Sequence, residues 1–358
     1  MPVDRAEKVI MVQAVNELAQ TLGTSAGGDV IGARLGLGAL ILAPMSGVTD
    51  VVFRRIAHRF GAALVVSEMV ASDALARRDH EALLRSEGTG VHPHVVQLAG
   101  CDAKWMAEAA QVAESSGAAV IDINMGCPAK KVVGGWAGSA LMRDLAHATT
   151  LIEAVAAAVK VPVTLKMRLG WDDASRNAPD LALRAQACGV RMVTVHGRTR
   201  CQFYKGRADW PAIRSVADAV SIPTVANGDI VTADDARLCL DQSGAQALMV
   251  GRSALGRAWL PAALGRALRD GGPALRPAAS VRRDAAIEHY DGLLALYGRN
   301  MGLRHARKHV AAYLQDACLG APDRLARHHG ALMSEDPSEV VRHIRDAFDA
   351  DETWAIAA

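Results

Sequence analysis

From about Leu37 onward, short apolar runs alternate with segments of helix length, and this alternation restricts the possible folds more than any other sequence feature. Alternating strands and helices are typical of βα units, which build parallel sheets. Eight apolar runs are present, at 39–45, 63–68, 94–98, 119–124, 162–166, 192–196, 223–227 and 247–250. Eight units over roughly 230 residues predict an α/β fold of the (β/α)8 or TIM barrel type. A doubly wound sheet usually has fewer strands and a nucleotide-binding fingerprint after the first one, and neither condition holds here.

Two further segments flank the barrel that we predict for residues 29–270. Residues 1–28 combine a weak amphipathic pattern with a glycine-containing stretch, so we expect a flexible N-terminal extension. After a joint rich in proline and glycine at 271–277, helical patterns follow at 281–297, 303–319 and 338–348. Residues 271–358 are therefore predicted to form a small all-helical C-terminal domain.

Composition narrows the class of protein. The chain has 358 residues, of which 51% are hydrophobic, and a formal net charge of +2, so it can bury a sizeable core. We find no apolar run long enough to span a membrane and no signal-peptide core, and we expect a cytoplasmic protein. Six cysteines without CxxC spacing argue against disulfides and a zinc site. The near-neutral charge excludes a generally basic nucleic-acid binder, and 4% aromatic residues argue against base stacking on a Phe/Tyr platform.

Catalytic residues of such barrels lie where strands end and βα loops begin. The eight runs end in Pro44-Met45-Ser46, Ser67-Glu68, Gln97, Asn124, Lys166-Met167-Arg168, His196-Gly197-Arg198, Asn227-Gly228-Asp229 and Gly251-Arg252. Alternation along the strands directs Thr164 and Lys166 toward the barrel interior. A single inward polar residue is often a hydrogen-bonded core group, and this alternative stays open for Asp122. Eight polar ends together indicate a functional mouth.

The last two strand ends predict a phosphate site. Gly228 and Gly251 lie in consecutive βα loops, where barrels of this type commonly hold a phosphate, and Arg252 adds a guanidinium. Tight turns are the alternative explanation for these glycines. Lys166 at the centre of the mouth would stabilise negative charge on a reduced flavin ring. FMN fits better than FAD or a dinucleotide, because no GxGxxG sequence follows any strand.

Cys127 is the candidate for chemistry. It follows the fourth strand between Gly126 and Pro128, so its thiol is predicted on a stiff loop over the mouth. A thiol placed there could donate a proton, attack as a nucleophile or bind a metal. A metal is disfavoured, since no His/Cys pair stands nearby at ligand spacing. A buried inert thiol is the remaining alternative.

In this order, the motifs resemble those of the tRNA-dihydrouridine synthases, particularly their bacterial B-type branch. The match runs from about Ile31 to Leu319 and includes 43–50, 66–69, 122–132, 165–168, 196–200 and 226–230. The resemblance implies an oxidoreductase with an FMN-containing barrel and a helical tail that reduces particular uridines in tRNA, using NADPH. N5 of the reduced flavin would give hydride to C6 of the uracil, and Cys127 would protonate C5. A base buried in folded RNA must first be extruded to reach the mouth.

Three groups of site residues follow from the resemblance, position by position. The residues expected around the flavin ring are Pro44, Met45, Ser46, Gln97, Lys166 and His196. Those expected at its ribityl phosphate are Asn227, Gly228, Asp229, Gly251 and Arg252. Asn124 would bond the flipped uracil, with Cys127 as the general acid. The residues expected to contact the tRNA are Lys130, Arg168, Arg198, Arg200, Arg304, Arg307 and Lys308, with His309 on the same basic helix.

Two other functions stay open at this point. A flavin reductase acting on a free pyrimidine or on dihydroorotate shares the barrel, FMN and an active-site Cys or Ser, but it needs no arginine-rich second domain. A non-catalytic RNA-binding protein that retains FMN would have no use for Cys127 beside Asn124. We favour the tRNA-modifying enzyme and expect a monomer that binds tRNA, with no membrane and no metal.

Overall fold

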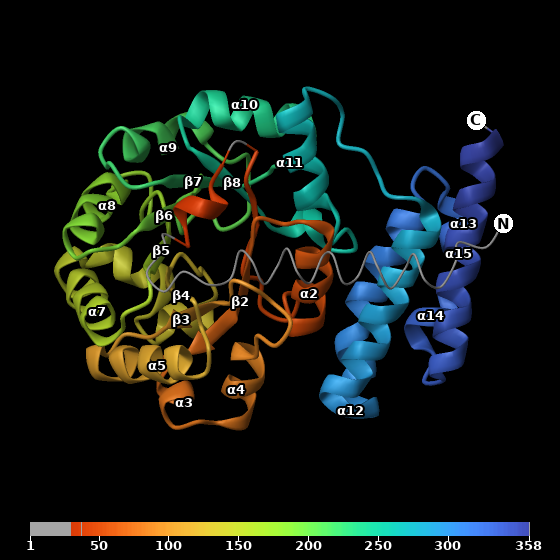
Figure 1. Ribbon diagram of the computed structural model, residues 1–358, viewed down its shortest axis with the longest axis horizontal. Helices are drawn as coiled ribbons and strands as arrows, with labels where there is room; N and C mark the ends of the chain where they lie inside the picture. The colour runs from red at the N-terminus through yellow and green to blue at the C-terminus, as the bar shows by residue number, and fades with distance from the viewer. Residues whose placement is uncertain (1–29, 37, 358) are drawn as a thin grey trace.

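The fold is a closed barrel of eight parallel strands in the order β1 to β8, with helices around it (Figure 1). We describe it from a computed structural model that covers residues 30–36 and 38–357; the extension predicted at 1–28 lies outside the described residues. The strands are β1 Leu40–Leu42, β2 Leu64–Ala71, β3 Val95–Ala99, β4 Val120–Met125, β5 Val163–Arg168, β6 Met192–His196, β7 Thr224–Asn227 and β8 Ala247–Val250. All eight predicted strands are present, and the predicted (β/α)8 fold is confirmed.

The helices of the barrel follow the strands in sequence order. They are α2 Val51–Phe60, α3 Ser72–Ala76, α4 His80–Ser86, α5 Ala103–Ser115, α6 Lys130–Gly134, α7 Leu145–Ala158, α8 Ala178–Ala187, α9 Trp210–Ala217, α10 Ala233–Ser243 and α11 Leu260–Asp270. Short 3-10 turns lie at η1 Gly32–Arg34, η2 Gly138–Arg143 and η3 Arg252–Ala254. None of the helices in the described part of the chain is long and apolar enough to cross a membrane.

Alternation along the strands separates two hydrophobic layers. Leu40 and Leu42 of β1 pack in the large cluster between the sheet and the helices. Ile41, between them, belongs to a second cluster with Val95 and Val225, so it points to the barrel interior. Apolar residues therefore fill the interior at the amino ends of the strands, and polar residues are left for the carboxyl ends.

The C-terminal helices form a separate layer beside the barrel (Figure 1). They are α12 Ala279–Ala317, α13 Pro322–Ala326, α14 Gly330–Met333 and α15 Pro337–Ala357. The first two predicted helices of this region are one element, α12, with a kink at Gly298, whose φ of 73° is not helical. The third predicted helix lies within α15. Tyr290, Val310 and Phe348 belong to a hydrophobic cluster of this layer alone, which gives the helices a core of their own.

Candidate active site at the carboxyl end of the barrel

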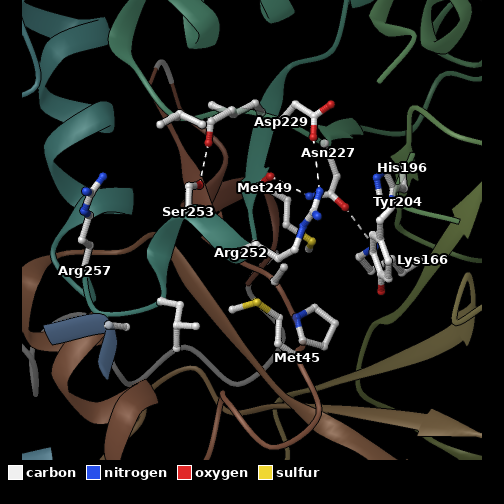
Figure 2. Close-up of a pocket in the computed structure, with 18 of the residues that line it drawn as sticks. Met45, Lys166, His196, Tyr204, Asn227, Asp229, Met249, Arg252, Ser253 and Arg257 are labelled. Atoms are coloured by element: carbon white, nitrogen blue, oxygen red, sulfur yellow. Dashed lines mark hydrogen bonds and ion pairs between the residues drawn. The ribbon is translucent and has the colours of Figure 1, made fainter. Parts of the chain in front are cut away.

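A cavity of about 480 Å³ opens at the carboxyl ends of β1 and β5 to β8. Nine of the residues predicted to hold FMN line it: Pro44, Met45, Lys166, His196, Asn227, Gly228, Asp229, Gly251 and Arg252. Two do not: Ser46 is exposed on the loop after β1, and Gln97 is fully buried below the mouth. Figure 2 shows Lys166 and His196 grouped on one side of the cavity and Ser253 and Arg257 on the other. The strand ends thus meet in one concave site.

Lys166 and His196 line the deep side of the cavity, and Lys166 supplies its positive charge. The Lys166 ammonium donates to Asn227 Oδ1 at 3.1 Å, and Asn227 Nδ2 donates to the carbonyl of Met249 at 2.8 Å. Burial, together with Arg168, lowers the pKa of Lys166 to about 8, so most of it is still cationic at neutral pH. Burial and the neighbouring cations hold the pKa of His196 well below its usual value, so this imidazole is neutral.

The loop after β7 is shaped for close approach. A Cβ atom added to Gly228, whose φ is 124°, would lie 2.8 Å from Ala208 Cβ and 3.0 Å from His196 Cδ2, so only glycine fits. Asp229 accepts from Arg198 at 2.5 Å and from the amide of Ala208 at 2.8 Å. Burial alone would raise the pKa of Asp229, but the hydrogen bonds from Arg198 and Ala208 and the charges of Arg198 and Arg252 together outweigh it, and the pKa is lowered. The Asp229 carboxylate is therefore occupied by hydrogen bonds from within the protein.

Arg252 is the exposed cation of the same region. Its side chain is 59% exposed and lies 3.4 Å from Asp229, a distance too long to hold it firmly. Its Cζ atom lies 4.8 Å from the ring centroid of Tyr204, which lines the cavity and is 43% exposed. Tyr204 was missed by the sequence analysis, because nothing in its local sequence distinguishes it. The same holds for Gln315 of α12, which reaches the cavity from the C-terminal layer.

A chain of buried hydrogen bonds crosses strands β3, β4 and β5 below the mouth. Asp122 accepts from Thr164 Oγ1 at 2.5 Å and from Gln97 Nε2 at 2.7 Å. Gln97 Oε1 in turn accepts from Asn124 Nδ2 at 2.7 Å. Burial raises the pKa of Asp122. Asp122 is thus a hydrogen-bonded core group, the alternative that the sequence left open.

Asn124 connects this chain of hydrogen bonds to the loop that carries Cys127. Its Oδ1 accepts from the backbone amides of Gly126 at 3.1 Å and Cys127 at 2.9 Å, while Ser139 donates to the Cys127 carbonyl at 2.9 Å. Cys127 is half-buried and lies within electrostatic range of Lys166, although it does not line the 480 Å³ cavity. The loop backbone is therefore fixed by side chains of β4 and η2.

Two arginines predicted to contact tRNA are instead buried. Arg168 and Arg198 are each 1% exposed. Arg168 donates at 2.8 Å to the carbonyls of Gly126 and Phe203, and so ties the Cys127 loop to the loop after β6. Arg198 is occupied by Asp229 and the carbonyl of Gly206. Both guanidinium groups therefore support loops from inside the protein.

The other predicted RNA contacts lie nearer the surface. Arg304, Arg307, Lys308 and Lys130 are exposed, and Arg200 is half-buried. Lys308 reaches the mouth, since a Cβ at Gly47 would lie 2.5 Å from its Nζ. His309 differs from the expectation: it is 2% exposed, and its ring packs 4.5 Å from that of His289.

Fold and site together define a (β/α)8-barrel protein with a cationic, glycine-shaped mouth beside an ordered cysteine loop. The family model described as Dihydrouridine synthase (Dus) matches residues 41–348. The chain belongs to the dihydrouridine synthase family and is an oxidoreductase, as the resemblance of its motifs predicts.

Curated relatives are similar in sequence to this chain over most of their length. A protein of Rhizobium leguminosarum bv. phaseoli named "Probable tRNA-dihydrouridine synthase" is 53% identical over 312 residues, 87% of this chain and 95% of that protein. One of the same name from Rhodobacter capsulatus is 51% identical, with 87% and 95% covered. "tRNA-dihydrouridine synthase B" of Xanthomonas axonopodis pv. citri is 44% identical, with 87% and 93% covered.

Proposed function

We propose that this chain is a flavin-dependent tRNA-dihydrouridine synthase, which uses FMN reduced by NADPH to convert uridine in tRNA into 5,6-dihydrouridine. One observation carries the proposal: a cysteine loop held by a buried hydrogen-bond chain lies beside a cavity that combines Lys166, His196 and Arg252. The relatives named as tRNA-dihydrouridine synthases support tRNA as the substrate. The buried hydrogen-bond chain across β3 to β5 would hold Asn124 and the Cys127 loop in place.

The cavity fits a flavin mononucleotide. Gly228 leaves room against Ala208 and His196 where a side chain would intrude, and the exposed guanidinium of Arg252 suits a phosphate. Pro44, Met45, Lys166 and His196 would face the ring, with Asn227 and Asp229 shaping the phosphate side. When bound, FMN supplies the hydride that adds to C6 of the uracil.

The chain's own residues supply the charge and the proton. Lys166, cationic at neutral pH, would stabilise negative charge on the ring of a bound flavin. Cys127 donates a proton from Sγ to C5 of the uracil, so that C6 gains hydride and C5 gains a proton across the double bond. Asn124 Nδ2 carries two hydrogens and donates only one to Gln97, which leaves the other for a uracil oxygen.

The C-terminal layer supplies the contact with RNA backbone. Arg304, Arg307 and Lys308 lie exposed on α12, and Lys308 approaches the loop after β1 at the mouth. Such cations bind phosphates without reading sequence. RNA held on α12 would therefore present a nucleotide to the Cys127 mouth.

The test replaces the proposed acid. We expect Cys127→Ala to keep flavin absorbance and NADPH oxidation by oxygen, while dihydrouridine formation on unmodified tRNA falls by about 100-fold or more, the usual contribution of a general acid. Cys188→Ala, a half-buried cysteine at the end of α8, is the matched control and should keep full activity. Full turnover by Cys127→Ala refutes the acid assignment, and a purified protein that takes up no flavin refutes the proposed function.

A further inference from the structure

Four side chains beside the Cys127 loop form an alternating stack of rings and guanidinium groups. The Cζ atom of Arg143 lies 5.6 Å from the ring centroid of Trp136 and 4.9 Å from that of Trp171. Arg200 lies over Trp171 at 4.8 Å. We call Trp136, Arg143, Trp171 and Arg200 the rim stack. Its members come from the loops after β4, β5 and β6, three neighbouring strands of the barrel.

The outer end of the rim stack is open to solvent. Trp136 is 61% exposed, and its φ of 58° is a conformation that a bulky residue rarely adopts. In the part of the chain that the structure describes, neither Arg143 nor Arg200 forms a side-chain hydrogen bond or ion pair, and Arg200 Nε is buried without a partner. Internal stability does not require an exposed ring and unpaired guanidinium groups at a strained position.

The segment that carries Trp136 and Arg143 is hydrogen-bonded directly to the proposed catalytic loop. Ser139, three residues after Trp136, donates its amide and its hydroxyl to the Cys127 carbonyl at 3.1 and 2.9 Å. Gly138 packs so closely that an added Cβ would lie 3.2 Å from Cys127 Cβ. The segment between Trp136 and Arg143 is therefore packed directly against the loop of Cys127.

We propose that the rim stack binds an unstacked nucleotide of the RNA substrate, next to the uridine that enters the mouth. Its base lies on the free face of Trp136, and its phosphates meet Arg143 and Arg200. This inference rests on the proposed function and deepens it. Extruding one base exposes the face of its neighbour, and an aromatic ring accepts any base by stacking. The unpaired cations favour a polyanion over an apolar protein partner.

Stacking and charge are separable in a binding experiment. We measure the affinity for unmodified tRNA across a salt series, together with flavin absorbance and NADPH oxidation. We expect Trp136→Ala to weaken binding by about tenfold with an unchanged salt slope, as loss of one stacked base predicts. Trp136→Phe keeps a ring and should recover most of the affinity. Arg143→Gln should instead make the salt slope shallower by about one. Flavin absorbance should not change in any of them.

The control and the outcomes distinguish the two proposals. Leu183→Ala removes a side chain that is 46% exposed on α8, away from the mouth, and should bind tRNA like the wild type. Wild-type affinity in Trp136→Ala, or an equal loss in Trp136→Phe, overturns the rim-stack proposal while the proposed function stands. A wild-type protein that binds tRNA through Trp136 but forms no dihydrouridine overturns the proposed function alone. A wild-type protein that binds no RNA overturns both.

Discussion

Gln97 is the residue through which the barrel core reaches the Cys127 loop, so its replacement tests the hydrogen-bond chain most directly. Its side chain is fully buried, donates to Asp122 at 2.7 Å and accepts from Asn124 at 2.7 Å. Gln97→Met keeps the length of the side chain and removes both hydrogen bonds. Two buried polar groups then lose a partner.

The loss of stability in Gln97→Met follows from the two groups left unsatisfied, on Asp122 and Asn124. Each buried polar group left unsatisfied costs about 1 to 3 kcal/mol, which gives about 2 to 6 kcal/mol for the pair. Burial already raises the pKa of Asp122, so this carboxyl can take up a proton instead of staying charged, which favours the lower half of that range. We expect the free energy of unfolding to fall by about 3 kcal/mol, measured by urea denaturation followed by circular dichroism.

A second readout reports on the loop itself. Asn124 loses one of its anchors in Gln97→Met, so the Cys127 thiol should react faster with iodoacetamide, as measured by mass spectrometry of its peptide. Gln186→Met is the matched control: its amide accepts from Ser221 at 2.7 Å before β7, at the amino end of the barrel. The control should leave Cys127 labelling unchanged. A stability loss below about 1 kcal/mol, or equal labelling in both variants, refutes the reasoning.

Two further predictions concern pH and salt. Burial, together with Arg54, lowers the pKa of His94 to about 4, so the unfolded chain, with a pKa of 6.5, takes up a proton first as pH falls. The stability from His94 is complete above pH 6.5 and about 2 kcal/mol is lost by pH 5. Urea denaturation of His94→Gln should show a pH dependence flatter by that amount, and parallel curves would contradict it. Arg304→Ala with Lys308→Ala should weaken tRNA binding and make its salt slope shallower by about two, and unchanged affinity would remove α12 from the RNA interface.

The barrel could be predicted because each strand corresponds to a short local pattern in the sequence. The eight apolar runs and the polar residues that end them are local patterns, and parallel pairing brings those ends together. Thr164 and Lys166 point inward as strand alternation requires, and both make side-chain hydrogen bonds there. The side-chain directions predicted from alternation along each strand are therefore the ones found in the sheet.

Roles that depend on loop packing could not be predicted in this way. Arg168 and Arg198 look like rim cations in the sequence, yet each finds carbonyl or carboxylate partners contributed by other loops and is buried. A low aromatic content argues against base stacking only if the aromatic residues are spread evenly. Trp136 and Trp171 come from different loops and meet through Arg143, which no count of residues reveals.

The C-terminal layer helps to form the cavity and also carries the cations that we propose to bind RNA. His289 of α12 contacts Asp50 Oδ2 at 3.0 Å and Tyr313 at 2.8 Å, and Asp50 caps α2 directly after the loop that contributes Met45 to the cavity. Asp316 accepts from Arg257 at 3.0 Å, and both line the same cavity. Because α12 is fixed to the barrel at these points, the exposed cations on its surface are held at a set distance from Cys127. In the proposed function, phosphates bound by α12 would therefore determine which nucleotide reaches the mouth.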